Sequence, residues 1–338
     1  MGPSDVAMRR ASPTRGHNAH VNGRFAPSPT GPLHLGNLRT AIAAFLAARA
    51  AGLGFVVRME DLDRVTSSQA HEERQLADLA DLGVRADGPV VRQSERTARY
   101  RAAIERLEAA GAVYPCFCTR REIRAEIDAA DRAPHGLHPD GAYPGTCRDL
   151  DAAGRAARVA AGSRGALRLR ADGQRVTVVD GVVGVTSGVV DDVVLARADG
   201  VAAYNLAVVV DDAAQDVTQV VRGDDLLSST PRQVLLQRLL GLPTPSYLHV
   251  PLVLGPDGAR LAKRHGAVTL AETLGDRSGG ARRDRLVAVC SVLCRSLGVL
   301  GDDERIAPEE LAALAPRFSA AALPRTPVRW DDVAAALR

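Results

Sequence analysis

The distribution of apolar and polar residues over the first sixty positions predicts a strand, a loop, a helix and a second strand. Residues 23–26 form a short apolar segment, and a loop rich in proline and glycine spans residues 27–37. Apolar residues then recur at helical spacing, and Gly52 is placed to end that helix. The continuous apolar run over residues 54–60 is typical of a strand buried on both faces. This order is a βαβ unit, which predicts a parallel sheet.

Further elements follow along the chain, and one stretch differs from the rest in composition. Between Tyr114 and Gly200, cysteines cluster and short valine-rich segments alternate with polar residues, which indicates an inserted α+β module. From Leu270 onward the pattern is helical. The other predicted elements are helices over 68–82 and 94–111, a buried strand over 204–210, a helix capped by Ser229, Thr230 and Pro231, a strand over 248–254 and a turn over 255–258.

The composition is that of a globular chain. Hydrophobic residues make up 46% and charged residues 25% of the 338 residues, which excludes disordered and fibrous classes. No apolar run approaches the ~20 residues that a membrane span needs. The N-terminal residues include arginines but no apolar core, so they predict a disordered leader rather than a secretory signal. Five cysteines, an odd number, in a chain without a signal predict reduced thiols and a cytoplasmic protein.

The positive charges are almost all arginine. The 43 basic and 40 acidic side chains give a net charge of +3. The first 24 residues contain four arginines and one acid, so the rest of the chain balances at 39 against 39. A nucleic-acid footprint would therefore have to be a local patch. Of the 43 basic residues 42 are arginine, and Lys263 is the single lysine.

The loop over residues 27–37 lies where open parallel sheets bind ligands, beyond the carboxyl end of a strand and before a helix. Gly36 would let a phosphate approach the backbone, and His34 and Asn37 could donate hydrogen bonds to it. The loop contains neither the dinucleotide-binding nor the P-loop glycine pattern. From residue types alone, a helix cap or a surface position is the more common role of a histidine such as His34.

Five segments that follow one another in register resemble the glutamyl branch of the class I aminoacyl-tRNA synthetases. Residues 24–41 (RFAPSPTGPLHLGNLRTA) resemble the HIGH-motif region, and residues 58–63 (RMEDLD) resemble the R-x-E-D-x-D motif of that branch. Residues 260–264 (RLAKR) lie where its KMSKS loop would be. Two further segments, residues 204–212 and 222–226, also match it.

The resemblance implies an α/β fold, namely a class I synthetase Rossmann-like parallel sheet with an inserted zinc-containing α+β module and a C-terminal helical stem-contact region. The implied segments are a disordered leader (1–21), the first half of the catalytic domain (22–112), an inserted tRNA-binding module with the zinc site (113–200), the second half of the catalytic domain (201–268) and the helical region (269–338).

By the same resemblance, the chain would activate glutamate with ATP and Mg²⁺. ATP would contact His34, Gly36, Asn37 and Lys263, and all of these except Gly36 would be catalytic. An ammonium is a compact charge on a flexible stem, which suits a lysine that follows charge developing on phosphate. Asn37 stands where the family has a second histidine, and Ala262 stands where it has a serine. These two differences leave the reaction rate open.

The resemblance also implies a pocket for glutamate. Arginine suits the carboxylates of this substrate and an acid suits its ammonium, which Glu60 would hold. The residues that would surround the rest of the substrate are Arg24, Ala26, Ser28, Tyr204 and Arg222. The simpler alternatives are a surface ion pair between Arg58 and Glu60 and a core position for Tyr204. Asp61 and Asp63 could be exposed caps at a strand end.

A cluster of three cysteines suggests a structural zinc site, which needs four ligands. The cysteines are Cys116, Cys118 and Cys147. Spacing alone would choose His135 or His138 as the fourth ligand. The segment from Tyr143 to Cys147 resembles the C-x-C…Y-x-x-x-C arrangement of glutamyl-queuosine tRNA(Asp) synthetases, which implies Tyr143 instead. The alternative is three unrelated buried cysteines.

The length of chain after the KMSKS-like segment bears on which tRNA would accept the glutamyl group. About 75 residues follow Lys263, whereas glutamyl-tRNA synthetases that read an anticodon carry a large helical region there. The truncated family that the chain resembles transfers glutamate to queuosine in the anticodon of tRNA(Asp). The implied partners are ATP, L-glutamate and this tRNA, held mainly by arginine, with no membrane and no protein partner. A shortened conventional glutamyl-tRNA(Glu) synthetase and a non-catalytic tRNA-binding paralogue stay open as alternatives.

Overall fold

The structure is a computed structural model that describes residues 21–119, 121–125, 143–261, 265 and 268–337. Three predicted features lie outside the described residues. They are all but the last residue of the leader over 1–21, the alternative zinc ligands His135 and His138, and the segment with Ala262 and Lys263.

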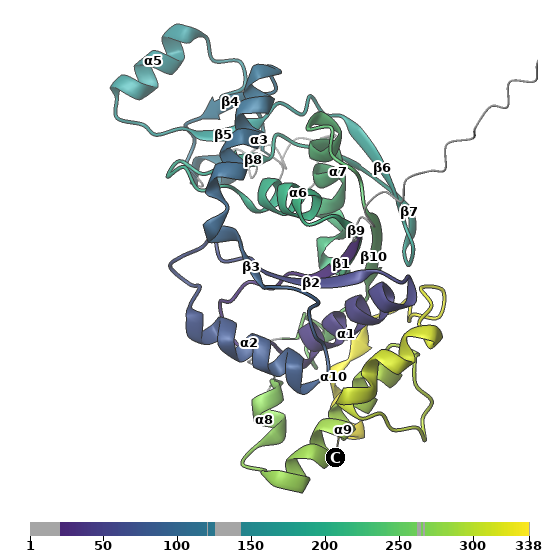
Figure 1. Ribbon diagram of the computed structural model, residues 1–338. Helices are drawn as coiled ribbons and strands as arrows, with labels where there is room; N and C mark the ends of the chain where they lie inside the picture. Colours follow the sequence, from purple (N-terminus) through teal and green to yellow (C-terminus); the bar gives the residue numbers. More distant parts are fainter. Residues whose placement is uncertain (1–20, 120, 126–142, 262–264, 266–267, 338) are drawn as a thin grey trace, which may run out of the picture.

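Short strands rich in valine and aromatic residues form a seven-stranded central sheet (Figure 1). The strands lie in the order β3 (Val91–Arg92), β2 (Gly54–Met59), β1 (Asn22–Phe25), β9 (Val217–Gly223), β10 (Ser246–Val250), β6 (Arg175–Asp180) and β7 (Gly184–Val189). Every neighbouring pair is parallel except the β6–β7 hairpin, which confirms the parallel sheet. Successive side chains point to opposite faces, so Val220 and Val221 of β9 enter two different cores.

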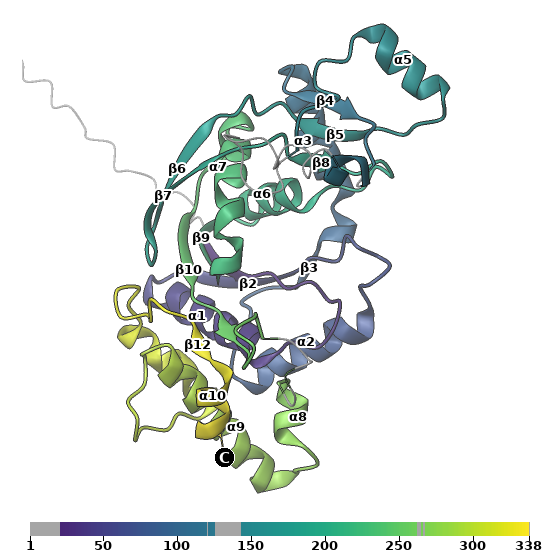
Figure 2. The ribbon, with the colours of Figure 1, turned by 180° about the vertical axis from the view of Figure 1, so that it is seen from behind.

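Helices cover both faces of the sheet and close these two cores (Figure 2). On one face lie α1 (Leu35–Ala50), α9 (Gly279–Ser296) and the 3₁₀ helix η4 (Pro308–Arg317), and on the other lie α3 (Thr97–Ala109), α6 (Tyr204–Ala214) and α7 (Thr230–Leu239). Twelve of the sixteen residues of α1 are buried, because its alanine-rich surface fits between the sheet and the C-terminal helices. Further elements are α2 (Gln69–Asp81), α8 (Leu270–Leu274), α10 (Trp330–Ala336), η1 (Gln93–Glu95), η2 (Asp224–Ser229), β11 (Val253–Leu254) and β12 (Val328–Arg329).

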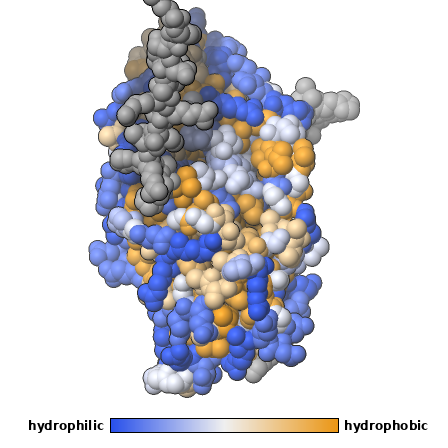
Figure 3. All heavy atoms as spheres, turned by 45° about the vertical axis from the view of Figure 1, so that its right-hand side comes forward, coloured by the Kyte–Doolittle hydropathy of each residue, from blue (hydrophilic) through white to orange (hydrophobic). Residues whose placement is uncertain are grey.

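The predicted inserted segment divides between two sheets. One part forms a separate antiparallel sheet together with a helix, namely β4 (Val113–Cys116), β5 (Ala166–Leu169), β8 (Val194–Ala196) and α5 (Ala152–Ala160). The β6–β7 hairpin instead joins the central sheet through a pairing of Tyr247 with Asp180. Val179 and Val185 pair across this hairpin and are 73% and 74% exposed. Apolar patches lie among hydrophilic atoms on this side of the molecule (Figure 3).

One predicted element is wrong in kind. The apolar run over 204–210, expected to be a strand, is the first part of α6. A short run that is apolar throughout fits a buried strand or a buried helix equally well, and here the residues from Leu206 to Val209 are buried in a helix.

Three other boundaries differ from the prediction. The strand expected over 248–254 is interrupted, since β10 ends before Pro251 and β11 begins after it. Ser229 forms no side-chain cap, because η2 runs directly into α7. Helix α1 begins one turn earlier than its apolar spacing indicates, at Leu35, so the end of the predicted loop is its first turn. The helices over 68–82 and 94–111 and the turn over 255–258 are confirmed.

Candidate active site

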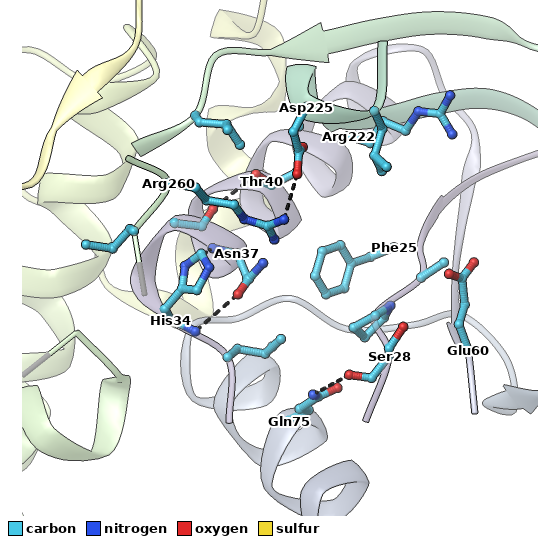
Figure 4. Close-up of a pocket in the computed structure, with 18 of the residues that line it drawn as sticks. Phe25, Ser28, His34, Asn37, Thr40, Glu60, Gln75, Arg222, Asp225 and Arg260 are labelled. Carbon is cyan, nitrogen blue, oxygen red and sulfur yellow. Dashed lines mark hydrogen bonds and ion pairs between the residues drawn. The ribbon is translucent and has the colours of Figure 1, made fainter. Parts of the chain in front are cut away.

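A cavity of about 810 Å³ opens at the carboxyl ends of β1 and β9, beside the first residues of α1 and α6. Because parallel strands end at a common sheet edge, residues distant in sequence meet here. Figure 4 shows His34 and Asn37 on one side of the cavity and Glu60 and Arg222 on the other, with the ring of Phe25 between them. Nine predicted site residues line the cavity: Arg24, Ala26, Ser28, His34, Gly36, Asn37, Glu60, Tyr204 and Arg222.

His34 is the N-cap of α1. Its Nδ1 accepts a hydrogen bond from the Asn37 backbone N–H at 3.1 Å, and Asn37 Oδ1 accepts one from the His34 N–H at 3.2 Å. A Cβ on Gly36 would lie only 3.0 Å from His34 Nδ1, so glycine leaves this cap undisturbed. Burial and the positive charge of Arg260 lower the pKa of His34 to about 4. The ring is therefore neutral near pH 7, with its proton on Nε2, so it can both cap the helix and donate a hydrogen bond.

Buried polar contacts fix the loop that precedes α1. Gln75 Nε2 on α2 donates to the carbonyl oxygens of Ser28 at 3.0 Å and of Gly31 at 2.7 Å. The Glu60 N–H donates to Pro27 O at 2.9 Å, which ties the loop to the end of β2. The hydrogen bond between Gln75 and Ser28 is visible in Figure 4. The cavity wall is thus held from two neighbouring elements.

Arg58 is fully buried within a group of carboxylates. Its guanidinium lies 2.8 Å from Asp212 Oδ1, 3.4 Å from Glu60 Oε1 and 3.9 Å from Asp211 Oδ2. Burial alone would lower the pKa of Arg58, but the attraction of Asp212, Glu60 and Asp211 outweighs burial and raises it. The alternative of an Arg58–Glu60 pair on the surface is therefore wrong. Arg58 neutralises acids beneath the cavity and is not among the residues that line it.

Arg222 is held by neutral groups instead. Its Nε donates to His249 Nε2 at 3.0 Å, its Nη1 to Gln233 Oε1 at 2.8 Å and its Nη2 to Thr230 Oγ1 at 2.9 Å. These bonds use three of the five N–H groups of a guanidinium, and two are left. Since no carboxylate takes part in these bonds, the positive charge of Arg222 is available to an anion in the cavity.

Arg24 and Glu60 complete the charged part of the cavity wall. Arg24 is 4% exposed, donates from Nη1 to Val221 O at 3.2 Å and lies 3.7 Å from Asp212. Burial raises the pKa of Glu60 and outweighs the positive charges of Arg58 and Arg24, which lower it, so the net effect is a rise. An acid and two arginines thus face one cavity, a charge pattern that matches an α-amino acid with a second carboxylate.

Three further side chains decide between the remaining alternatives. Tyr204 is 36% exposed at the first turn of α6 and lines the cavity, so its alternative as a core aromatic is wrong. Asp63 accepts a hydrogen bond from the Val65 N–H at 3.1 Å and acts as an exposed cap, which was the alternative considered for Asp61 and Asp63. Asp61 accepts from the N–H and hydroxyl of Ser94 at 2.8 and 2.6 Å and so anchors η1.

An ion pair crosses the mouth of the cavity. Arg260 Nη1, in the KMSKS-like segment, lies 2.6 Å from Asp225 Oδ2 at the start of η2 (Figure 4). Both side chains are partly exposed, at 52% and 28%. The pair joins the segment that leads to Lys263 to the strand end that carries Arg222.

The three cysteines among the four predicted zinc ligands lie together. Cys116, Cys118 and Cys147 have Sγ atoms within 4.8 Å of one another. Tyr143 Oη lies 3.3 Å from Cys116 Sγ and 3.6 Å from Cys118 Sγ. Tetrahedral ligands about 2.3 Å from a zinc ion are separated by about 3.8 Å, so this spacing fits. The Phe117 N–H also donates to Cys147 Sγ at 3.4 Å, a contact that favours a thiolate.

Sequence reasoning missed the residues that support the site. Gln75, His249 and the buried position of Arg58 were not predicted, although each contacts or orients a predicted residue. A signal existed for two of them: Arg58 and His249 each interrupt an otherwise apolar strand. A polar side chain at a position buried on both faces requires a partner.

Comparison with known proteins agrees with this geometry. The family described as tRNA synthetases class I (E and Q), catalytic domain, matches residues 20–311. A crystal structure of a glutamate tRNA ligase from Elizabethkingia meningosepticum in complex with its amino acid has a TM-score of 0.76 at 27% identity. That match covers 94% of this chain and 68% of the ligase. In the described part of this chain, no helix has the length and apolarity to cross a membrane.

Relatives of higher identity narrow the family. A glutamyl-Q tRNA(Asp) synthetase from Nocardia farcinica is 57% identical over 305 residues, which cover 90% of this chain and 91% of that protein. A protein of the same name from Symbiobacterium thermophilum is 49% identical over 319 residues, which cover 91% and 95% of the two chains. Given this likeness over nearly the whole length and the cavity described above, the chain belongs to the glutamyl-Q tRNA(Asp) synthetase family of class I synthetases.

Proposed function

We propose that this chain activates glutamate with ATP and transfers the glutamyl group to the queuosine base in the anticodon of tRNA(Asp). A glutamate carboxylate oxygen attacks the α-phosphorus of ATP, and pyrophosphate leaves. A hydroxyl of the queuosine cyclopentene-diol then attacks the acyl carbon of glutamyl-adenylate, and AMP leaves. The observation that carries the proposal is a single cavity with a neutral histidine at a helix N-terminus on one side and Arg222 and Glu60 on the other.

The two sides of the cavity suit the two substrates. On one side, His34 Nε2–H and the N-terminus of α1, with Gly36 and Asn37, would donate to phosphate oxygens, where negative charge collects in the transition state. On the other side, Arg222 and Arg24 would bind the carboxylates of glutamate, and Glu60 would hold its ammonium. Ala26, Ser28 and Tyr204 would complete that wall, and Lys263 would reach the phosphates from the KMSKS-like segment.

Two metals belong to the proposal. Mg²⁺ bound with ATP would supply positive charge to the phosphates. A structural zinc ion would be held by Cys116, Cys118, Cys147 and Tyr143. Tyr143 suits this role because its oxygen accepts from the Cys147 N–H at 2.9 Å and lies 3.3 Å from Cys116 Sγ and 3.6 Å from Cys118 Sγ.

The acceptor is the second half of the proposal. The module over 113–200, with its zinc site, would hold the anticodon arm of the tRNA, and the helices over 269–338 would contact its stem. A shortened tRNA(Glu)-charging enzyme would share the same cavity, and a non-catalytic paralogue would share the fold. The names of the relatives favour tRNA(Asp), and the uncompensated charge of Arg222 favours an active glutamate site.

Two assays, charging of tRNA and ATP–pyrophosphate exchange, separate the proposed function from the two alternatives. Labelled glutamate and ATP are incubated with the protein and with queuosine-containing tRNA(Asp), unmodified tRNA(Asp) or tRNA(Glu). We expect label only on the queuosine-containing tRNA. Label on tRNA(Glu) would identify the conventional enzyme, and no ATP–pyrophosphate exchange with glutamate would identify the non-catalytic paralogue. Lys263→Arg should lose most of this exchange, because a planar guanidinium does not replace a compact ammonium.

A further inference from the structure

A chain of buried hydrogen bonds leads from the β6–β7 hairpin to the glutamate side of the cavity. Asp180, the last residue of β6, has its Oδ2 2.6 Å from His249 Nδ1 on β10. His249 Nε2 in turn accepts from Arg222 Nε at 3.0 Å. The three residues are 3%, 0% and 4% exposed, so water does not compete for these bonds.

The directions of these bonds determine the tautomer of His249. Arg222 Nε always carries a hydrogen, so His249 Nε2 must accept and remain unprotonated. The proton therefore lies on Nδ1, where the Asp180 carboxylate accepts it. Burial lowers the pKa of His249, the bond to Asp180 raises it and the charge of Arg222 lowers it, with the net effect downward, so the ring is neutral.

Asp180 is itself held in one orientation. Its Oδ1 accepts from the backbone N–H groups of Val182 and Val183, each at 2.9 Å, at the turn of the hairpin. Its Oδ2 also lies 3.1 Å from the His249 backbone N–H. The carboxylate thus receives four donors from two segments, and only one of them is the imidazole. The imidazole ring is further kept in plane by stacking on Tyr247, with ring centroids 6.0 Å apart.

We propose that Asp180 and His249 are positioning residues for glutamate binding. Asp180 selects the His249 tautomer that presents a lone pair to Arg222, and His249 then sets the orientation of the guanidinium without neutralising it. A carboxylate in the place of His249 would hold Arg222 as firmly but would cancel the charge that attracts the substrate. The inference rests on the proposed role of Arg222 in binding a glutamate carboxylate.

The first test is Asp180→Asn. Because two backbone N–H groups face Oδ1, the asparagine oxygen will occupy that position and its NH₂ will face His249 Nδ1. His249 then carries its proton on Nε2, against the N–H of Arg222. We expect the KM for glutamate in ATP–pyrophosphate exchange to rise about 10- to 100-fold, with the KM for ATP unchanged. ¹⁵N NMR of the imidazole should show the proton on Nδ1 in the wild type and on Nε2 in the variant.

Two variants of His249 and one control separate positioning from folding. Gln in place of His249 can offer an oxygen to Arg222, whereas Asn is too short, so His249→Gln should retain more glutamate affinity than His249→Asn. Asp192→Asn is the matched control, since Asp192 is equally buried but accepts from Tyr114 and Arg148 and makes no contact in the Arg222 network. It should lower the thermal midpoint and leave the KM for glutamate unchanged.

The outcomes distinguish this inference from the proposed function. A wild-type protein that shows no exchange with glutamate overturns the proposed function and the inference with it. An active wild type with an unchanged glutamate KM in Asp180→Asn overturns the inference alone. So does an equal rise in both KM values, or a similar rise in Asp192→Asn, because each would indicate a general structural effect. Should Asp180→Asn fail to fold, equal glutamate KM values in His249→Gln and His249→Asn would refute the inference.

Discussion

Replacing Arg58 by methionine should destabilise the fold strongly at neutral pH. The guanidinium is fully buried and lies among three carboxylates, at 2.8 Å from Asp212, 3.4 Å from Glu60 and 3.9 Å from Asp211. Methionine fills a similar volume but supplies no charge. Removing one partner of a buried ion pair typically costs about 3–5 kcal/mol, because the remaining charge is left in a medium of low polarity.

The loss should fall mainly on two of the three acids. Asp211 keeps Arg96 at 2.5 Å and the hydroxyl of Tyr100 at 2.6 Å, so it remains compensated. Of the cations in the described part of the chain, Asp212 keeps Arg24, whose Nε is 3.7 Å away. Asp212 and Glu60 therefore become the under-compensated carboxylates, and we expect a loss in the free energy of unfolding within the range of about 3–5 kcal/mol.

The pH dependence of the loss identifies its cause. Burial already raises the pKa of Glu60 in the folded protein, and losing the charge of Arg58, which lowers that pKa, raises it further. A carboxyl group with a raised folded pKa destabilises the fold while it is ionised, and the penalty shrinks as pH falls and the group binds a proton. The difference between wild type and variant should therefore be smaller at pH 5 than at pH 8.

Urea unfolding followed by circular dichroism measures this difference, with the midpoint expected to fall and the slope to stay unchanged. Arg58→Lys is the control, since it keeps the charge but loses the planar fork, and it should cost less than Arg58→Met. A loss in Arg58→Met below about 1 kcal/mol, or one independent of pH, would refute the reasoning, because it would show that the carboxylates do not need this cation.

Three further predictions concern separate parts of the molecule. The purified protein should contain one zinc ion per chain, and either a chelator or Cys147→Ser should lower both the zinc content and the thermal midpoint; a midpoint insensitive to chelation would contradict a structural zinc. NMR titration of the His34 imidazole should give a midpoint near 4, and a midpoint near 6.5 would disprove its burial. The free energy of unfolding of the wild type, measured relative to His34→Asn, should fall as pH drops from about 6.5 to 4, because the imidazole binds its proton at a higher pH in the unfolded chain. Gly83→Ala should lower the free energy of unfolding, measured in urea, by more than about 2 kcal/mol, since φ is +77° and a Cβ would lie 1.8 Å from Pro308 O. Gly52→Ala is the control and should lower it by only about 1 kcal/mol, because φ is +67° but the space around a Cβ is open. Equal losses in the two variants would show that Pro308 moves aside.

The elements that could be predicted from sequence are those with a local signal. The strand over 54–60 was predicted because a continuous apolar run begins at Gly54 and ends in polar residues. The helix after the loop was predicted because apolar residues recur at helical spacing between a proline- and glycine-rich loop and Gly52. The run over 204–210 failed because it is too short and too uniformly apolar for its period to separate strand from helix. Pairing of the β6–β7 hairpin with β10 could not be predicted, since the contact of Asp180 with Tyr247 joins segments far apart in sequence.

The candidate site shows the same division. The nine cavity residues were implied by motif resemblance, and the structure brings all of them to one cavity. The residues that hold them were missed, because their partners are remote: Gln75 lies 47 residues from Ser28, and Asp180 lies 69 residues from His249. Short motifs report the side chains that face a ligand, whereas tertiary packing decides which buried groups orient them.

The groups around each buried arginine indicate whether its charge is neutralised within the protein or is available to a ligand. Arg58 is surrounded by acids, so its charge is neutralised within the protein. Arg222 is also buried, but among the described residues its hydrogen bonds go to an imidazole, an amide and a hydroxyl, so its charge remains for an anion. A guanidinium can be fixed by three such bonds and still offer two N–H groups, which an ammonium with three donors cannot do. Arginine therefore suits the rigid site for a carboxylate. Lys263, the single lysine of the chain, lies in the KMSKS-like segment, and the resemblance implies that it contacts the phosphates of ATP, where negative charge develops during the reaction.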